Sequence, residues 1–209
     1  MLITSAVFQA RPGKSEEAAG RVLGIFQAAS KATGVPFMVW GGVAGVPFGS
    51  FLGSARFDNM AHYLESGQKM SSDAEFKKAT LGLDDTMAGP TETFLNEVIA
   101  VTGEVGDPKP LVLVTRATLV AANLTAGLGW STKVAQYVTD ATGVGGTVTI
   151  SKAGPMFQVS WLGGVQDGAQ LDEVDGKLNG DANYLAMIEA GSQYFIPGSS
   201  QRVLIARIG

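Results

Sequence analysis

The sequence predicts an α+β fold in which two similar β-α-β-β-α-β units follow one another. The main observation is an internal repeat, because residues 31–35 (KATGV) return 109 positions later as residues 140–144 (DATGV). Residues 69–76 resemble residues 177–184 at a spacing of 108, and a one-residue loop deletion explains the difference. Since a repeat of this kind marks repeated structural units, we expect two homologous halves of roughly 100 residues each.

The first half begins with a predicted strand at residues 2–10 and a Pro-Gly turn, after which Ser15 is predicted to cap a helix. Two glutamates follow Ser15, while Lys31 and Gly34 lie at the end of the helix, which is the charge order that the helix dipole favours. The other predicted elements of this half are strands at 37–43 and 48–57, a helical stretch from residue 59 that Ser72 or Asp73 can restart, and a strand at 94–101.

The same order of elements begins again after residue 110. Strands are predicted at 111–120, 146–152, 157–165 and 202–208, with helical regions at 124–141 and 171–190. Residues 103–110 hold two prolines and two glycines, which is typical of a linker. We therefore assign residues 1–102 and 111–209 to two ferredoxin-like halves, each with two helices on one face of a four-stranded antiparallel sheet.

Alternation along the strands predicts which faces are buried. In the second half, Val148 and Trp161 belong to apolar rows that alternate with Thr149 and Ser160, so each strand has one apolar and one mixed face. The apolar face should receive the helices. Carried back through the repeat, the mixed face of the first half holds Met38, Trp40, Phe51 and Gly53. Such a face is too apolar to leave in water, so we expect the two units to pack sheet to sheet within the chain.

Composition excludes several classes of function. The net charge is −4 with no basic stripe, which argues against nucleic acid as a partner, and the chain has no cysteine for a disulfide or a thiolate nucleophile. Charged residues make up 16% of the chain, against about 25% in an ordinary soluble protein, which favours a homo-oligomer with part of its surface covered. The first ten residues lack the features of a secretion signal. We expect a cytoplasmic protein that does not bind membranes.

Several short motifs carry a family resemblance. They are residues 49–53 (GSFLG) with Asp58, the helical segments 73–76 (DAEF) and 181–184 (DANY), and the closing strands 98–101 (VIAV) and 204–207 (LIAR). With the order of elements, they resemble the dimeric α/β-barrel superfamily, and most closely a tandem repeat of antibiotic biosynthesis monooxygenase-like domains. The resemblance covers nearly the whole chain. It implies an intrachain dimeric α/β barrel with a pocket in each half or in the closed barrel.

The resemblance also implies two kinds of function. One is the binding of a small apolar or aromatic molecule, or its oxygenation by a monooxygenase-like enzyme that needs neither a metal nor a flavin cofactor. In that chemistry a substrate carbanion reacts with dioxygen, and the protein supplies a base and a dry, aromatic-lined pocket. The alternative is a non-catalytic structural or assembly protein whose barrel is filled by side chains. A pocket with a few convergent polar groups would favour ligand binding.

His62 and Trp40 are the candidate residues of the first half. His62 is the only histidine, and an imidazole that titrates near neutral pH can act as a general base. The alternative is a partly exposed residue in the first turn of a helix, and its predicted counterpart in the repeat is Leu171. Strand alternation places Trp40 on the sheet face away from the helices, where it could bind a planar ligand or simply pack between the two sheets.

Arg116, Glu97 and Tyr184 are further candidate ligand contacts. Arg116 follows two valines on one face of a strand, where a charge must either be paired or serve a ligand, as an arginine clamp on a carboxylate or phenolate does. Pairing of Arg116 with Glu97 would be structural. Tyr184 replaces Phe76 of the first half and could donate a hydrogen bond into the second pocket, with ordinary partial burial as the alternative.

Overall fold

The computed structural model describes residues 1–104 and 106–209, so Val105, within the predicted linker, lies outside the described residues. The elements of the first half are β1 (Leu2–Gln9), α1 (Ser15–Thr33), β2 (Phe37–Ala44), β3 (Ser50–Phe57), α2 (Met60–Ser72), α3 (Ala74–Thr80), the short 3-10 helix η1 (Leu83–Asp85) and β4 (Glu92–Thr102). Their order confirms the predicted β-α-β-β-α-β unit, with its second helical stretch divided in two.

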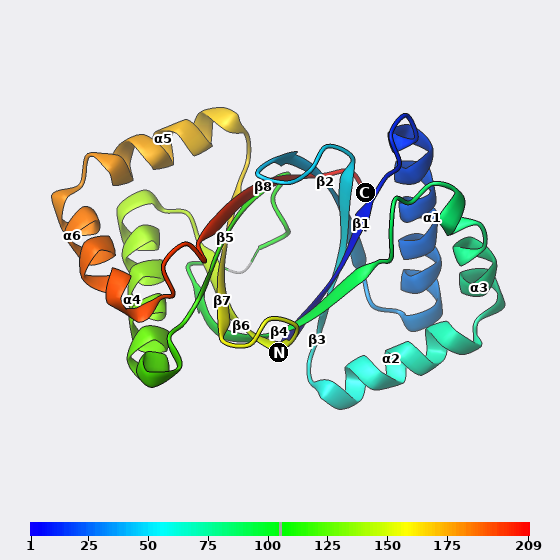
Figure 1. Cartoon of the computed structure of the whole chain (residues 1–209), viewed down its shortest axis with the longest axis horizontal. Helices are drawn as coiled ribbons and strands as arrows, with labels where there is room; N and C mark the ends of the chain where they lie inside the picture. Colours follow the sequence, from blue (N-terminus) through cyan, green and yellow to red (C-terminus); the bar gives the residue numbers. More distant parts are fainter. Residues whose placement is uncertain (105) are drawn as a thin grey trace. The chain divides into compact units, whose positions relative to one another are not determined.

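The second half repeats this order. Its elements are β5 (Leu111–Thr118), η2 (Ala121–Asn123), α4 (Leu124–Thr142), β6 (Gly146–Ala153), β7 (Gln158–Val165), α5 (Gly168–Asn179), α6 (Ala182–Gly191), η3 (Ser192–Tyr194) and β8 (Gln201–Arg207). Hydrogen bonds join the eight strands in the order β1-β3-β2-β8-β5-β7-β6-β4, which closes a barrel (Figure 1). The predicted α+β barrel of two repeated units is therefore confirmed.

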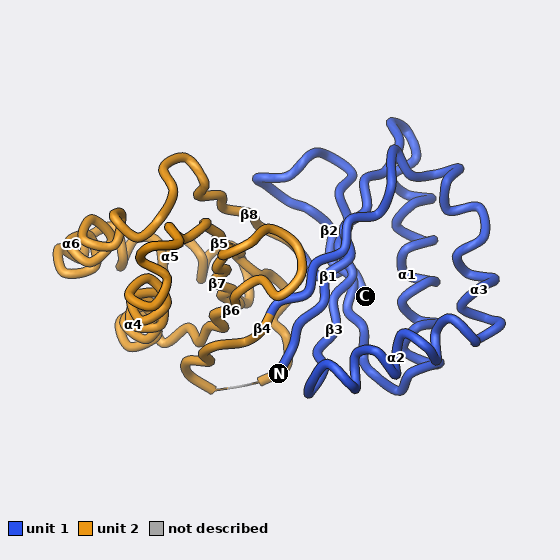
Figure 2. The backbone as a smooth tube through the Cα atoms, turned by 60° about the horizontal axis from the view of Figure 1, so that its bottom comes forward, with its two compact units in different colours: residues 1–96, 206–209 blue, residues 97–205 orange. Residues whose placement is uncertain are grey.

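The chain divides into two compact units whose boundary differs from the predicted one. One unit is Met1–Asn96 with Ala206–Gly209, and the other is Glu97–Ile205 (Figure 2). The predicted halves meet at residues 103–110, whereas the compact units divide within β4 and again within β8. The last residues belong to the first unit because they pair with β2: Ile208 N donates to Val39 O at 2.9 Å, and Val39 N donates to Gly209 O at 3.2 Å.

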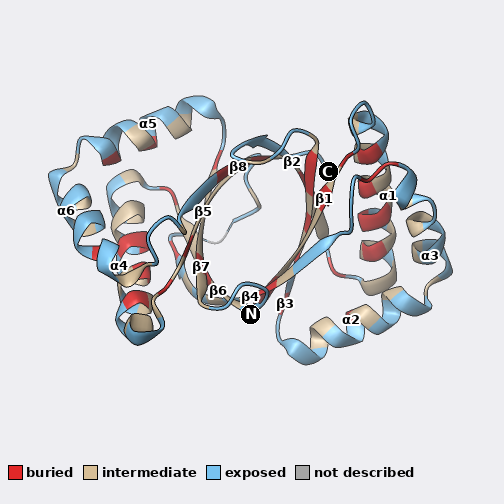
Figure 3. Cartoon of the chain, viewed as in Figure 1, coloured by how far each residue is buried: buried red, intermediate tan, exposed pale blue. Residues whose placement is uncertain are grey.

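In the first unit, α1, α2 and α3 lie on one face of the strands (Figure 1). Small and branched residues of α1 face the sheet (Figure 3), and Phe26 joins them with its ring edge-on to Phe8 and stacked on Phe37. The buried residues of α1 are Ala18, Val22, Ile25, Phe26 and Ala29. Burial of an apolar stripe on a sheet is the main stabilising term for such a helix.

In the second unit, α4, α5 and α6 cover the corresponding face (Figure 1). Leu119, Val148 and Val159 are fully buried there. Trp161 packs against this core, and the indole of Trp130 on α4 lies edge-on to it with ring centroids 6.1 Å apart. The predicted packing of Trp161 beneath the helices is confirmed.

The helix caps agree with those predicted from the sequence, with one exception. Gly34 and Gly143 end α1 and α4 in the same left-handed conformation, with φ angles of 75° and 74°, which glycine adopts without steric cost. Asp73 caps α3 by accepting a hydrogen bond from Phe76 N, as predicted. The prediction that Ser15 caps α1 is wrong: a tight turn in which Lys14 N donates to Arg11 O places Lys14 at the N-cap position.

The β6–β7 hairpin corrects the alignment of the two halves. Gly49 O accepts from Ala10 N, and Phe157 O accepts from Leu119 N, so Gly49 and Phe157 are equivalent at a spacing of 108 rather than 109. The one-residue deletion therefore lies within this hairpin, before β7. Phe51 corresponds to Val159 and, like it, lies in the core beneath the helices.

The corrected alignment also changes the sheet face assigned to Gly53. Gly53 lies in β3 two residues after Phe51, so both residues face the helices. A Cβ added to Gly53 would overlap the Phe26 ring. The prediction of Phe51 and Gly53 on the mixed face is therefore wrong, while that of Met38 and Trp40 stands. Among the described residues, no helix is both long enough and apolar enough to cross a membrane.

Candidate functional site

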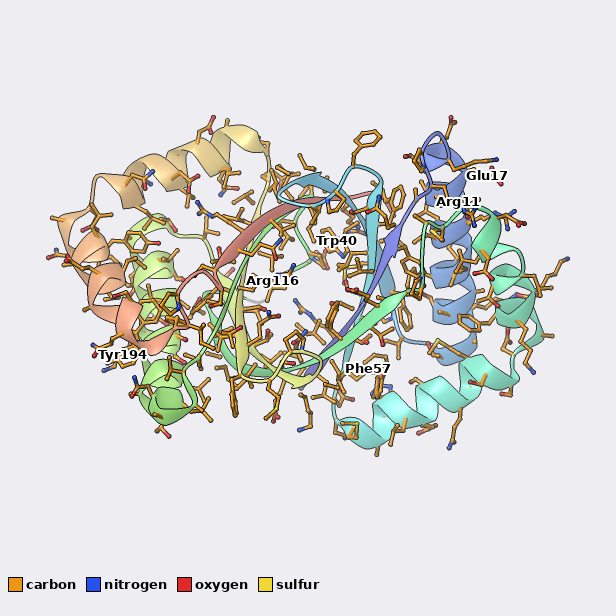
Figure 4. The ribbon with its side chains drawn as sticks, in the orientation of Figure 1. Arg11, Glu17, Trp40, Phe57, Arg116 and Tyr194 are labelled. Carbon is orange, nitrogen blue, oxygen red and sulfur yellow. The ribbon has the colours of Figure 1, made fainter. Side chains whose placement is uncertain are left out.

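The candidate site lies on the face of the second unit's sheet that is opposite α4. On β5, Leu111 packs against the helices and Ala117 is buried, so the alternate residues Val112, Val114 and Arg116 must point to the other face. Figure 4 shows the Arg116 side chain on the side of the strands away from α4. The sequence predicts only that Arg116 shares a strand face with two valines, and the structure shows that this face is the one opposite α4.

Arg116 is held by a glutamine rather than by a carboxylate. Its Nε and Nη2 donate to Gln201 Oε1 at 2.8 and 2.5 Å. No carboxylate among the described residues forms an ion pair with it, although the side chain is half-buried. The predicted partner, Glu97, instead binds Lys152 Nζ at 2.9 Å at an exposed position. Arg116 is therefore a fixed cation without a counter-charge from this part of the chain.

Two hydroxyl side chains continue from Arg116 across the sheet. Ser160 on β7 lies directly opposite Arg116, and Thr149 on β6 lies directly opposite Ser160. Both point to the face of Arg116, because their neighbours Val159 and Val148 pack into the helix-side core. We call Arg116, Ser160 and Thr149 the polar row.

Apolar side chains lie beside the polar row on the same face. Val114 and Leu162 form the next cross-strand pair along the sheet. On β8, Val203 and Ile205 are buried and alternate with Arg202, which reaches Asp175 on the helix side. Further polar side chains share the face: Thr147 is the cross-strand partner of Leu162, and Thr118 is the partner of Gln158. The face therefore combines apolar side chains with one cation and several neutral polar groups, as the lining of a small-molecule site does.

Two apolar residues of β4 share this face and stay open to solvent. Ala100 packs into the helix-side core and Thr102 bonds to Thr139 of α4, so Ile99 and Val101 point the other way. Their exposed fractions are 36% and 40%, which is high for residues on a sheet face. These two residues add exposed apolar surface to the same sheet face, three strands away from Arg116.

Trp40 lies on the equivalent face of the first unit. Phe37 and Val39 pack beneath the helices, and Figure 4 shows Trp40 on the opposite side of β2 from α1. The indole is 5% exposed, and its Nε1 donates to Ser54 Oγ at 2.9 Å. Because the ring is enclosed and its one donor is already used, the geometry favours a packing role over ligand binding.

His62 closes the first turn of α2. Its backbone N donates to Asn59 Oδ1 at 2.9 Å, while its Nδ1 accepts from Asp58 N at 3.5 Å and lies 3.3 Å from Asp58 Oδ2. Gln170 makes the same contacts at the start of α5, with Asp167 Oδ1 and Gln166 N. The counterpart of His62 is therefore Gln170, not Leu171, which is a second consequence of the shifted alignment. These contacts resemble a capping box.

Tyr184 lies on the helix side of the second unit. It packs against the core that contains Leu178, and its ring stacks on Tyr137 with centroids 6.5 Å apart. Burial raises the pKa of the Tyr184 hydroxyl. The structure therefore does not bring Tyr184 or Glu97 to the polar row. The described residues also contain no group of three or more His, Asp or Glu that could hold a metal ion.

Sequence reasoning missed three residues of the site. Thr149 and Ser160 were noted only as the polar members of alternating strands, and Gln201 lies one residue before the predicted last strand. The alternation of polar and apolar residues does indicate that Thr149 and Ser160 lie on the mixed face of the sheet. It does not give the pairing register of the strands, which places Ser160 and Thr149 in line with Arg116.

No protein-family model and no curated protein matches the sequence, but solved structures match its fold. A protein from Fusobacterium nucleatum, described as a putative monooxygenase, gives a TM-score of 0.75 over 100% of this chain and 92% of its own, at 6% identity. An anthrone oxidase-like protein gives 0.68 over 100% and 91%, at 13% identity. A second protein described as a putative monooxygenase, from Lactobacillus acidophilus, gives 0.67 over 99% and 93%, at 9% identity. The chain thus has the dimeric α/β-barrel fold that its sequence resembles, with both halves in one polypeptide.

Proposed function

We propose that this protein binds a small, largely apolar molecule that carries one anionic oxygen group, a carboxylate or a phenolate, and that Arg116 is its anchor. One observation carries the proposal: a half-buried arginine is bonded to the neutral Gln201 and has no carboxylate partner among the described residues. A charge in such surroundings is costly unless it is paired. An anionic ligand group would supply the missing charge.

The way Gln201 holds Arg116 suits this role. A guanidinium has five N–H donors in a rigid plane, and Gln201 engages two of its nitrogens. The remaining donors on Nη1 and Nη2 stay available in a fork that matches a carboxylate in geometry. An anionic partner is required for this pairing, so ligand binding should follow the ionisation of the ligand.

Oxygenation is the narrower form of this proposal. Two of the proteins with the same fold are described as putative monooxygenases and one as anthrone oxidase-like. A ligand with an acidic CH₂ next to a carbonyl would bind as its enolate, with the negative oxygen on Arg116 and the proton released to water. The carbanion would then react with dioxygen, so that the CH₂ group and O₂ give a carbonyl and one water.

Calorimetric titration with a panel of aromatic carboxylates and phenols tests the binding proposal. Arg116→Met should weaken binding about 10- to 100-fold, as expected for loss of a charge-assisted hydrogen bond. Arg202→Met is the matched control, because Arg202 pairs with Asp175 on the helix side of the same sheet. Equal affinities for Arg116→Met and the unchanged protein would refute Arg116 as the anchor, and no binding across the panel would favour a structural protein.

Oxygen uptake tests the narrower form. An anthrone-type compound mixed with the protein should consume dioxygen faster than it does in buffer, with one carbonyl product formed for each O₂. Arg116→Met should remove this acceleration. Binding without any acceleration would reject the oxygenase reaction and leave the binding function in place.

A further inference from the structure

We infer that Thr149 and Ser160 form a second polar subsite, which makes the protein selective for flat molecules that carry a neutral hydroxyl or carbonyl opposite their anionic end. The inference rests on the proposed function, because it takes Arg116 as the anchor of the anionic end. It adds the class of ligand and two residues that determine specificity.

The geometry of the sheet fixes the spacing of the two subsites. Arg116, Ser160 and Thr149 are direct cross-strand partners on the adjacent strands β5, β7 and β6. Neighbouring strands lie about 4.8 Å apart, so the backbone positions of Arg116 and Thr149 are about 10 Å apart. The guanidinium bonds to Gln201 on β8, on the other side of β5 from β7. A ligand that reaches from it to Thr149 is therefore at least as long as two fused six-membered rings with a substituent at each end.

Thr149 shows the strongest sign of a missing partner. The residue is only 2% exposed, yet its hydroxyl forms no hydrogen bond with any described residue, and the same holds for the hydroxyl of Ser160. Buried hydroxyls are almost always hydrogen-bonded. Every fully enclosed side-chain nitrogen or oxygen in the described part of the chain has a partner, so the Thr149 oxygen must stay reachable. A ligand oxygen can provide the missing bond.

The first unit shows that the fold does not require a polar row. The positions equivalent to Arg116, Ser160 and Thr149 are Val7, Leu52 and Trp40, which are also direct cross-strand partners. This row is apolar throughout. Since the same place in the repeat is filled by apolar side chains in one unit, the three polar residues of the other unit are explained better by a ligand than by folding.

Two probes separate the subsites: 2-naphthoate has only the anionic group, whereas 6-hydroxy-2-naphthoate also has a hydroxyl at the far end. The unchanged protein should bind the hydroxylated probe about 3- to 10-fold more tightly, as one additional neutral hydrogen bond predicts. Thr149→Val and Ser160→Ala together should remove this preference and leave the affinity for 2-naphthoate unchanged. Thr115→Val is the matched control, because Thr115 lies next to Arg116 but pairs with Trp161 on the other face.

The outcomes distinguish this inference from the proposed function. Arg116→Met should weaken both probes equally. If Arg116→Met does so but the preference survives in Thr149→Val with Ser160→Ala, the subsite is wrong and the anchor stands. If the double variant removes the preference but Arg116→Met changes nothing, the anchor is wrong. If the unchanged protein binds neither probe but binds other members of the panel through Arg116, the second subsite is wrong and the anchor stands.

A measurement without ligand provides an independent check. Because Thr149 makes no side-chain hydrogen bond in the free protein, Thr149→Val should keep or raise the melting temperature. A clear drop would show that the hydroxyl already has a structural partner, which would overturn the subsite.

Discussion

The two units fill the space between the long helix and the sheet with a large side chain from different elements. In the first unit, the large Phe26 of α1 fills the space over Gly53 of β3, where a Cβ would overlap its ring. In the second unit, the equivalent helix position is the small Ala135, and the equivalent strand position is Trp161. The Trp161 Nε1 donates to Ser131 O of α4 at 3.0 Å. The large side chain is on the helix in the first unit and on the strand in the second, and in both units it fills the space between helix and sheet.

This exchange shows why the repeat is strong in some places and faint in others. Turn positions such as Gly34 and Gly143 keep their identity, because backbone conformation allows few alternatives there. Core positions are constrained as facing pairs, because interiors are close-packed and only the summed volume must be right. Residue identity therefore drifts at the core while the architecture persists.

The largest expected effect comes from transferring the second unit's arrangement to the first. Phe26→Ala should destabilise the protein by about 3–5 kcal/mol through the cavity it leaves. Gly53→Trp should cost about 1–3 kcal/mol or more through overpacking. The double variant should be more stable than the sum of the two costs implies, with a coupling of about 0.5–3 kcal/mol in chemical denaturation. Strict additivity of the two costs would contradict the exchange.

A smaller effect is expected at the hairpins. Phe157 has φ of 60° where its counterpart Gly49 has 80°, and this left-handed region costs a residue with a side chain about 1–2 kcal/mol. Phe157→Gly should therefore be about 1 kcal/mol more stable than Phe157→Ala, and Gly49→Ala should be destabilising by a similar amount. Gly20→Ala, in the open middle of α1, is the control and should be neutral or stabilising. Melting curves compare all four variants. Equal stability of Phe157→Gly and Phe157→Ala would show that the backbone at Phe157 is not strained.

The smallest effect is expected at the helix starts. Because His62 and Gln170 make equivalent contacts, His62→Gln should change the free energy of unfolding by less than about 0.5 kcal/mol, whereas His62→Ala and Gln170→Ala should each cost about 0.5–1 kcal/mol. Thermal unfolding measures all three variants. If His62→Gln also abolished oxygen uptake, the histidine would have a chemical role that its capping contacts do not explain.

The sequence predicted the elements and their repeat because both depend on local patterns. Helix periodicity, strand alternation and the turn glycines predicted the order of helices and strands in both halves. The cap at Lys14 was missed because the preceding turn, not the residue type, determines where α1 begins. The shift in the second hairpin was missed because Phe157 gives no sign in the sequence that it occupies a glycine conformation.

The candidate site was predicted only in part, for a similar reason. The anomaly of Arg116 follows from its apolar neighbours on one strand, but the sequence does not show which face of the sheet they share. Its contact with Gln201 joins residues that are 85 positions apart, and the line through Ser160 and Thr149 depends on the register of three strands. Neither is a local property. His62 stood out in the sequence only because it is the single histidine.

The division of β8 between the units has a consequence for synthesis on the ribosome. The β2 residue Val39 obtains its backbone hydrogen-bond partners from Ile208 and Gly209, which are synthesised about 170 residues later (209 − 39 = 170). At about 5–20 residues translated per second, the edge of β2 stays unpaired for roughly 10–30 s after β2 itself is translated. During this interval its open edge is a template for pairing with another nascent chain. Removal of residues 206–209 would leave the edge of β2 unpaired in the finished protein. We expect this variant to aggregate rather than to show only local fraying.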